Sequence, residues 1–468
     1  MLWTLENILA ATNARIVARG ADAPVAGIAI DTRHLAAREF FVAIAGAHFD
    51  GHNFIAAAKS AGAVGCLVQR CDDTLRAAAG DLWILQVPDT LVALGQLAHW
   101  WRAQHTGAQY VGITGSNGKS TTKEMVASIA QSRGAVLKTE GNFNNLIGLP
   151  LTLLRLNESH RTAVIEMGMS AAGEIAALTD CLVPDIGVIT NVTAAHLETL
   201  RTVENVAQAK GELFTHMRST GTIVVNAEDP WVTQVASGFA GRVLSFGMGN
   251  TCDVQFGRMI SEGFTGTDLR LYIFGREYHT QIPVPGTHNV MNALAATAVG
   301  IALGIDPNAM MELLPTFRPM RMRMERVQLE NGVQVINDSY NANPESMQAA
   351  LRTVGAAKRA GRFLAVLGDM LELGEQADEC HATLGRRAVA SGVDHLFVMG
   401  SYADNVVSGA ADAGMPSEKI YATPEDRDWL QSSLLATVQP GDVVLVKGSR
   451  GMAMEQIVEF LKTQIGVC

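Results

Sequence analysis

The hydrophobic positions divide the chain into short apolar runs, typical of buried strands, and longer stretches with the period of a helix. In the middle of the chain, four runs rich in β-branched residues are of the first kind: 110–114, 163–165, 186–192 and 222–225. Stretches with helical period lie between them, among them 119–131 and 203–217. Alternation of this kind predicts a parallel sheet covered by helices.

The pattern changes on both sides of this region. Residues before Pro88 contain short apolar runs at 40–44 and 82–87, and a helix at 91–104 leads into the central strands. Apolar and polar residues alternate after a run at 243–246, within residues 252–282, which predicts a few antiparallel strands. A helix is then expected at 290–303.

Prolines at 315 and 319 interrupt the helical pattern and mark a second boundary. Beyond them, four apolar runs, each followed by a helical stretch, predict a second parallel sheet: 333–336, 363–367, 395–398 and 443–446. We therefore expect an α/β protein of three domains, at 1–88, 89–317 and 318–468. The central domain is expected to be a P-loop-type parallel sheet domain, and the C-terminal one a doubly wound, Rossmann-like domain.

Composition narrows the function classes. A chain of 468 residues is too long for one hydrophobic core. Its formal net charge of −10 gives no basic surface for nucleic acid. The longest mostly apolar stretch, 293–305, is too short to cross a bilayer, and the N-terminus lacks the basic start of a secretory signal. Six scattered cysteines without a C-x-x-C pair fit reduced thiols, so we expect a cytoplasmic protein without disulfides. We also expect a monomer.

The strongest local motif is GITGSNGKSTT, which runs from Gly112 to Thr122. An apolar strand, a glycine-rich turn and a helix start point backbone N–H groups at a phosphate. Lys119 is placed to neutralise phosphates, and the Ser120 hydroxyl is placed to bind magnesium. The core Gly115-x-x-Gly118-Lys119-Ser120 is intact, although Ile113 stands where the usual pattern has its first glycine. The motif predicts ATP binding.

Two polar residues follow neighbouring strands of the predicted central sheet. Glu166 ends the run at 163–165, and His196 follows the run at 186–192. The carboxyl ends of parallel strands share one edge, where the glycine-rich turn also lies. Both side chains could therefore complete a magnesium site, although histidine is a less usual magnesium ligand than oxygen. Each residue taken alone also fits a structural role.

Further polar groups stand beside predicted elements, and the residues alone leave their roles open. Asn289 and Asn292 begin a helix and fit either a ligand contact or capping. Asp338 ends a strand, and Asn341 and Asn343 follow in a loop that suits a ligand or a turn. Arg323 is one of four neighbouring arginines, and position does not choose among them: 318, 321, 323 and 326. The segment 447–450 suits either a carboxylate or a solvated turn.

Taken together, these motifs resemble one family. The ordered segments GSNGKST, IEMG, NVTAAHLE, AQAKGELF, GTHNVMNALAA and DSYNANP are similar to those of the Mur ligases of peptidoglycan synthesis. The segments IDTRHLAAREFFVAIAGAHFDGHNFI, TEGNFNNLIGLPLTLL, VLGDMLELG and VLVKGSRGMAME also fit, so the resemblance covers nearly the whole chain. The segments DSYNANPESM, GDMLELG and KGSR resemble the branch that adds D-alanyl-D-alanine to UDP-N-acetylmuramoyl-tripeptide.

The resemblance implies three domains, which bind the UDP substrate, ATP and D-alanyl-D-alanine in chain order. It implies that ATP phosphorylates the tripeptide carboxylate, that the amine attacks the acyl phosphate, and that two magnesium ions assist. Lys119, Lys210 and His196 would act in catalysis, and the metal would be held by Ser120, Glu166, His196 and Lys210. The implied ATP contacts are Gly115, Ser116, Asn117, Gly118, Lys119, Ser120, Thr121, Asn289, Asn292, Arg323 and Asp338. The implied substrate contacts are Thr32, Arg33, Asn142, Asn144, Asn341, Asn343, Lys447, Ser449 and Arg450.

Lys210 receives its role from the resemblance alone, because a lysine on a helix reads by itself as a surface residue. It matches a lysine that is carbamylated in the family, which turns a cation into an anionic oxygen donor for the second magnesium. Thr32-Arg33 departs from the Ser-Arg that is common in related ligases. Two other readings remain open: a different amide ligase of the superfamily, such as a folylpolyglutamate synthase, and a P-loop nucleotide switch that forms no amide.

Overall fold

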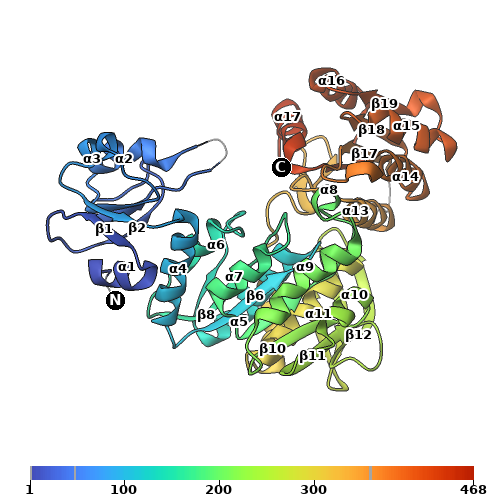
Figure 1. The fold of residues 1–468 in the computed structure, drawn as a ribbon. Coiled ribbons are helices and arrows are strands. Elements are labelled where there is room, and N and C mark those ends of the chain that lie inside the picture. The colour runs from blue at the N-terminus through green and yellow to red at the C-terminus, as the bar shows by residue number, and fades with distance from the viewer. Residues whose placement is uncertain (1–2, 47–48, 358–360) are drawn as a thin grey trace.

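The computed structural model describes residues 3–46, 49–357 and 361–468. These residues form three sheets that follow one another along the chain, each flanked by helices. We call the three sheets with their helices the N-terminal, central and C-terminal units. The central unit stands between the N-terminal unit (blue) and the C-terminal unit (orange to red) in Figure 1.

The N-terminal unit is built on a five-stranded sheet in which only β1 is antiparallel to its neighbour. Its strands, in sheet order, are β1 (Arg15–Ala18), β5 (Trp83–Gln86), β4 (Gly65–Val68), β3 (Glu39–Val42) and β2 (Gly27–Ala29). Its helices are α1 (Leu5–Thr12), α2 (Ile55–Ser60) and α3 (Asp73–Ala79). The runs predicted at 40–44 and 82–87 are β3 and β5. Phe40 and Phe41 are both buried because they pack into clusters on opposite faces of the sheet.

The central unit contains a nine-stranded sheet. Its strands, in sheet order, are β14 (Arg276–Ile282), β13 (Gly266–Ile273), β12 (Val254–Gly263), β11 (Arg242–Gly247), β10 (Thr222–Asn226), β9 (Ile186–Ile189), β6 (Gln109–Thr114), β8 (His160–Glu166) and β7 (Ala135–Lys138). Strands β6 to β11 and β12 pair in parallel, whereas β12, β13 and β14 pair antiparallel. The predicted parallel sheet and the antiparallel strands within 252–282 are therefore confirmed.

Helices cover both faces of this sheet. They are α4 (Thr90–Ala103), α5 (Lys119–Ala130), α6 (Gly148–Leu153), α7 (Glu174–Leu182), α8 (Leu197–Leu200), α9 (Val203–His216), α10 (Pro230–Ala236), α11 (Thr287–Ala302) and α12 (Pro307–Leu313). Tyr110 of β6 packs into the cluster that contains α7 and α9 residues, and Val111 packs into the one that contains α5 and α11 residues. Burial on both faces explains why the parallel strands read as continuous apolar runs.

Strand β9 is shorter than the run at 186–192 predicts. It ends at Ile189 because the next residues leave the sheet to contact the glycine-rich turn. The Ser116 N–H donates to the Asn191 carbonyl over 2.9 Å, and the Thr190 hydroxyl donates to the Asn117 carbonyl over 2.6 Å. Thr190 and Asn191 thus support the candidate site rather than extend the sheet.

The C-terminal unit has a six-stranded sheet with one antiparallel edge strand, β15. Its strands, in sheet order, are β15 (Glu325–Gln328), β16 (Gln334–Asn337), β20 (Val443–Lys447), β17 (Phe363–Gly368), β18 (His395–Met399) and β19 (Ile420–Thr423). Its helices are α13 (Pro344–Ala357), α14 (Ala377–Ala390), α15 (Ala403–Asp412), α16 (Arg427–Thr437) and α17 (Glu455–Ile465). The four predicted strands are β16, β17, β18 and β20, so the doubly wound α/β fold is confirmed.

The cysteines and the hydropathy of the helices bear on the remaining composition arguments. All six cysteines carry free thiols, and three of them, Cys66, Cys181 and Cys252, are buried. Among the residues that the structure describes, no helix combines the length and apolar character that a membrane span requires.

Candidate active site

The glycine-rich turn lies between β6 and α5, where the sequence predicted it. Gly115 and Gly118 have backbone φ angles of +147° and +81°, which residues other than glycine rarely adopt. A Cβ atom on Gly115 would lie 1.9 Å from the Thr190 hydroxyl, and one on Gly118 would lie 2.2 Å from the Asn292 amide oxygen. Both positions therefore require glycine. Gly118 precedes the first residue of α5, so the free N–H groups of that helix start open toward the turn.

Lys119 folds back over this turn. Its ammonium donates to the Gly115 carbonyl at 2.7 Å and to the Ser116 carbonyl at 3.3 Å. Burial lowers the pKa of Lys119, and the nearby Arg323 lowers it further, while Glu166 acts in the opposite direction. Carbonyl oxygens are weak partners for a cation compared with phosphate oxygens. The lysine is thus held next to the place where a phosphate would sit.

Glu166 lies at the carboxyl end of β8, directly beside β6. Its Oε2 accepts a 2.7 Å hydrogen bond from the Ser120 hydroxyl, and its Oε1 accepts one of 2.9 Å from the Asn144 amide. Burial by itself would raise the pKa of this carboxyl group, but the charges of Lys119 and Arg323 outweigh burial and lower it. Glu166 is therefore an ionised carboxylate, only 3% exposed.

Ser120 and Glu166 form a donor set that fits magnesium. Within the described ranges, no three His, Cys, Asp or Glu side chains cluster closely enough to hold a metal by themselves. Magnesium, however, usually keeps several waters and binds one or two carboxylates together with substrate phosphates. One hydroxyl and one buried carboxylate, next to a phosphate-binding turn, match that requirement.

His196 and Lys210 line the same cavity. His196 precedes α8 with a φ of 56°, and its Nδ1 lies 2.7 Å from Oε2 of Glu372 in the C-terminal unit. Lys210 is on α9 and is only 1% exposed, so the sequence-based reading of a surface lysine is wrong. Burial, reinforced by the charge of Lys119, lowers the pKa of Lys210 well below its usual value.

Asn289 and Asn292 lie in the first two turns of α11 and do not cap it. The helix is preceded by Gly286, which provides no side-chain cap, so the capping alternative is wrong. The Asn292 amide nitrogen donates to Asn289 Oδ1 at 3.1 Å, and the Thr122 hydroxyl donates to Asn292 Oδ1 at 3.3 Å. Both asparagines are nearly buried, at 4% and 5% exposed, and both line the cavity. Their hydrogen bonds connect α11 to the helix that follows the glycine-rich turn.

The structure distinguishes Arg323 from its neighbouring arginines. Its guanidinium lies 4.1 Å from the centre of the Tyr340 ring and donates a 2.9 Å hydrogen bond to the Ser120 hydroxyl. Its Nε is buried and has no hydrogen-bond partner. Arg321, by contrast, has a side chain that is 82% exposed. Arg323 thus reaches from the C-terminal unit to the glycine-rich turn and keeps one donor free.

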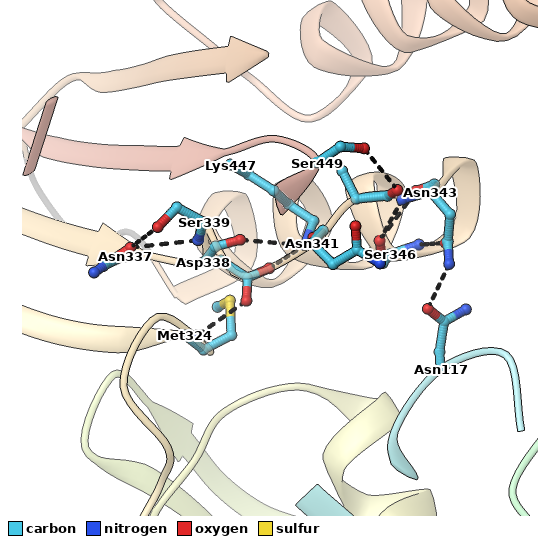
Figure 2. A network of polar contacts seen from close by, with 11 residues as sticks. Asn117, Met324, Asn337, Asp338, Ser339, Asn341, Asn343, Ser346, Lys447 and Ser449 are labelled. Atoms are coloured by element: carbon cyan, nitrogen blue, oxygen red, sulfur yellow. Dashed lines mark hydrogen bonds and ion pairs between the residues drawn. The ribbon is translucent and has the colours of Figure 1, made fainter. Parts of the chain in front are cut away.

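The loop after β16 forms a polar network with the end of β20 (Figure 2). The Lys447 ammonium lies 2.5 Å from Asp338 Oδ2 and donates to the Asn341 carbonyl over 2.9 Å. The Ser449 hydroxyl accepts a hydrogen bond from the Leu371 N–H over 2.9 Å, and Lys447 and Ser449 are both only 3% exposed. Much of the hydrogen-bonding capacity of these side chains therefore shapes the loop.

Asn343 extends this loop to the central unit. Its amide nitrogen donates a 2.8 Å hydrogen bond to Oδ1 of Asn117 in the glycine-rich turn, as Figure 2 shows. The amide nitrogen of Asn117 in turn donates to the Thr193 hydroxyl over 3.2 Å. The C-terminal unit is thus in contact with the glycine-rich turn and the start of α5, at Asn343 as well as at Arg323.

These groups surround a cavity of about 790 Å³ between the central and C-terminal units, a size typical of a small-molecule site. It brings together every predicted site residue except Thr32 and Arg33. Those two belong to the N-terminal unit, where the Arg33 side chain is 82% exposed and pairs with Asp31 at 2.6 Å. A second cavity of about 160 Å³ adjoins the first and shares Asn117 and Asn292 with it.

Several lining residues were not singled out from the sequence. The Tyr340 ring packs against the Arg323 guanidinium, and Glu372 contacts His196. Arg352, on α13, also lines the cavity. Burial lowers the pKa of His288 to about 4, so its imidazole is neutral. Tyr340 and Glu372 belong to the segments DSYNANP and GDMLELG, which drew attention as motifs. Their partners are distant in sequence, however, and nothing local indicates the contacts.

Comparison with known proteins identifies the class to which this fold and cavity belong. Residues 24–102 match the Mur ligase family, catalytic domain; residues 113–300 match the Mur ligase middle domain; and residues 322–450 match the Mur ligase, glutamate ligase domain. These matches cover most of the chain in the expected order. The chain belongs to the Mur ligase family.

Similar proteins point to one branch of the family. UDP-N-acetylmuramoyl-tripeptide–D-alanyl-D-alanine ligase of Bacillus subtilis is 36% identical over 435 residues, 93% of each chain. The crystal structure of MurF from Acinetobacter baumannii superposes with a TM-score of 0.91 at 29% identity and covers 99% of both chains. MurF of Thermotoga maritima in complex with ADP gives a TM-score of 0.83 at 27% identity, covering 94% of this chain and 97% of that one.

Proposed function

We propose that this chain is an ATP-dependent ligase that joins D-alanyl-D-alanine to UDP-N-acetylmuramoyl-tripeptide in peptidoglycan precursor synthesis. The observation that carries the proposal is the cavity in which a phosphate-binding turn, a buried carboxylate and the loops of the C-terminal unit meet. The Bacillus subtilis relative, named for this reaction, supports the choice of substrates because it is similar over 93% of each chain. ATP and a UDP-linked substrate are consistent with a reaction in the cytoplasm.

Each part of the chain has a proposed task. Residues 1–88 bind the UDP substrate, with Thr32 and Arg33 among the contacts, and residues 89–317 bind ATP. Residues 318–468 bind D-alanyl-D-alanine. The smaller cavity suits the adenine base, because its wall combines apolar side chains of Phe246, Met291 and Ala295 with the amide of Asn292.

The chemistry follows from the charges around the cavity. A carboxylate is a poor acyl donor because its leaving group is oxide, and ATP supplies a phosphoryl group that makes a better one. Two anions must first be brought together. Lys119 and Arg323 provide the positive charge that offsets their repulsion. Transfer gives ADP and an acyl phosphate; the D-alanyl-D-alanine amine then attacks the acyl carbon and inorganic phosphate leaves.

Ser120 and Glu166 would hold magnesium, with His196 and a modified Lys210 as further ligands. When bound, magnesium neutralises developing charge on the transferring phosphoryl group. The neutral amine of Lys210 can attack carbon dioxide, forming an N–C bond and releasing one proton to give a carbamate. Its lowered pKa favours this step, since only the neutral amine is a nucleophile. Asn142 and Asn144 would contact the peptide carboxylate side of the cavity.

The C-terminal loops are placed to receive the amine substrate and the nucleotide ribose. Asp338 would contact the ribose, and Asn341 and Asn343 line the cavity beside it. Lys447, Ser449 and Arg450 would bind the second substrate. Lys447 and Ser449 would also fix the conformation of the loop that surrounds it. Arg450 is 2.8 Å from Glu455 and would exchange this partner for a substrate carboxylate.

An assay of the purified chain with UDP-N-acetylmuramoyl-tripeptide, D-alanyl-D-alanine and ATP tests the proposal. We expect phosphate release that depends on both substrates, and a product whose mass equals the sum of the two minus one water. A different amide ligase would require another amine or acid. ATP hydrolysis without a joined product would favour a nucleotide switch and contradict the proposal.

The metal site leads to a separate prediction. Glu166→Gln and His196→Ala are each expected to raise the magnesium concentration needed for half-maximal rate by about tenfold, because each removes a ligand. Titration of the ligation rate with magnesium at saturating ATP measures this. Glu204→Ala, which changes an exposed acid on α9, is the matched control and should leave the magnesium requirement unchanged. Unchanged requirements in both ligand variants would contradict the assignment.

A further inference from the structure

Glu372 makes a contact between the central and C-terminal units that has no part in the proposed chemistry. It lies in the segment GDMLELG, after β17, and lines the cavity. Its Oε2 is 2.7 Å from Nδ1 of His196, and its backbone carbonyl accepts a 3.2 Å hydrogen bond from the Glu198 N–H. Figure 1 shows α8, which begins after His196, beside the C-terminal unit. Glu372 thus contacts both the His196 side chain and the first turn of α8 that follows it.

The backbone at both partners is unusual. His196 has a φ of 56° and Glu372 a φ of 63°, in the left-handed region that residues other than glycine seldom occupy. Such conformations cost free energy and persist only where surrounding contacts fix them. Gly374, two residues after Glu372, packs closely as well, since a Cβ there would lie 3.4 Å from the Glu198 Cα. The two turns are therefore shaped to fit one another.

The contact determines the state of the imidazole. An ionised carboxylate only accepts hydrogen bonds, so Nδ1 of His196 must carry the proton that points at Glu372. In the neutral ring, Nε2 then keeps its lone pair and faces away from Glu372. Histidines that bind metals characteristically donate their other ring N–H to a carboxylate or carbonyl, which fixes the ring orientation. The Glu372–His196 pair has this arrangement, with the Nδ1 atom of His196 on the carboxylate.

The pair contributes little to holding the molecule together. The His196 side chain is 25% exposed and that of Glu372 is 56% exposed, and polar contacts between side chains as accessible as these contribute little stability. The contacts of Arg323 with Ser120 and of Asn343 with Asn117 connect the same two units independently. Orientation of His196, rather than fold stability, is what the geometry explains.

We propose that Glu372 is a positioning residue: from the C-terminal unit it orients His196, so that this ligand is in place only when the two units are in contact. The inference rests on the proposed function for the identity of the metal. It makes the metal site of the central unit dependent on docking of the unit that binds the amine. Metal binding by the central unit and docking of the C-terminal unit are thereby coupled through the Glu372 side chain.

The test compares four proteins: wild type, Glu372→Ala, Glu372→Gln and Glu372→Asp. Glutamine keeps the length and an oxygen acceptor for the Nδ1 proton but removes the charge, whereas aspartate keeps the charge but is too short to reach. Binding of Mn²⁺, as a probe for magnesium, is measured by electron paramagnetic resonance in the presence of a non-hydrolysable ATP analogue. The Mg²⁺ dependence of kcat is measured in parallel.

We expect Glu372→Ala and Glu372→Asp to weaken Mn²⁺ binding about tenfold, and Glu372→Gln to remain within about threefold of wild type. Thermal unfolding midpoints should be the same in all four. Glu375→Ala, an exposed acid on the next turn, is the matched control and should bind Mn²⁺ as wild type does. Wild-type binding by Glu372→Ala would overturn the proposal, and so would the reverse order, with aspartate normal and glutamine impaired, because that order reports charge alone. Failure of wild type to form an amide product would contradict the proposed function, whereas the order of the Mn²⁺ affinities decides the role of Glu372.

Discussion

Replacing Lys119 with alanine is expected to lower kcat for ligation by a factor on the order of 10²–10³ while the protein remains folded. The lysine ammonium donates hydrogen bonds to the carbonyls of Gly115 and Ser116 in the glycine-rich turn. A phosphate is a stronger partner for this cation, so its contribution is made to the nucleotide rather than to the fold. Steady-state rates at saturating substrates measure the effect.

Two comparisons separate this effect from misfolding. The thermal midpoint of Lys119→Ala should stay close to that of wild type, because the variant removes a partly desolvated cation and leaves the glycines of the turn in place. Lys59→Ala, which changes an exposed lysine paired with Asp81 in the N-terminal unit, should ligate normally. Turnover near wild type in a folded Lys119→Ala protein would remove Lys119 from the mechanism.

Replacing Lys210 with alanine is expected to produce the second-largest loss, about a hundredfold in kcat, because the proposed carbamate supplies oxygen ligands that alanine lacks. The amine is buried, and burial together with the charge of Lys119 lowers its pKa, which favours the neutral form that reacts with carbon dioxide. Small carboxylates such as acetate or formate should restore part of the rate, since they fit the vacated space and carry the missing oxygens.

Lys210→Arg should not be restored by carboxylates, because the guanidinium stays charged and occupies the space. Gln208→Ala, on the exposed side of the same helix, provides the control for changes in α9. Removal of dissolved carbon dioxide should lower the wild-type rate without changing that of Lys210→Ala. A fully active Lys210→Ala enzyme would contradict both the carbamate and the metal role.

Local patterns predicted the central strands and helices because these depend on neighbours in sequence. The glycine-rich turn was placed correctly, since the strand, the two glycines and the helix start are adjacent. Strand β9 ended three residues early because Thr190 and Asn191 contact the turn around Ser116, which no local signal reveals. The sequence left capping and ligand contact open for Asn289 and Asn292 because both roles use the same side chains, and the structure excludes capping because α11 begins after Gly286.

The sequence by itself determined the α/β fold, the glycine-rich turn between β6 and α5 and, through its motifs, the family. It determined these because they depend on hydrophobic period and on residues adjacent in the chain. Only the tertiary structure showed that Lys210 is buried rather than on the surface, that Arg323 among four arginines reaches Ser120, and that Glu372 meets His196. The pairs Arg323–Ser120 and Glu372–His196 are separated by 203 and 176 residues. These contacts, and the burial that lowers the pKa of Lys210, arise from tertiary packing. A local sequence pattern does not reveal them.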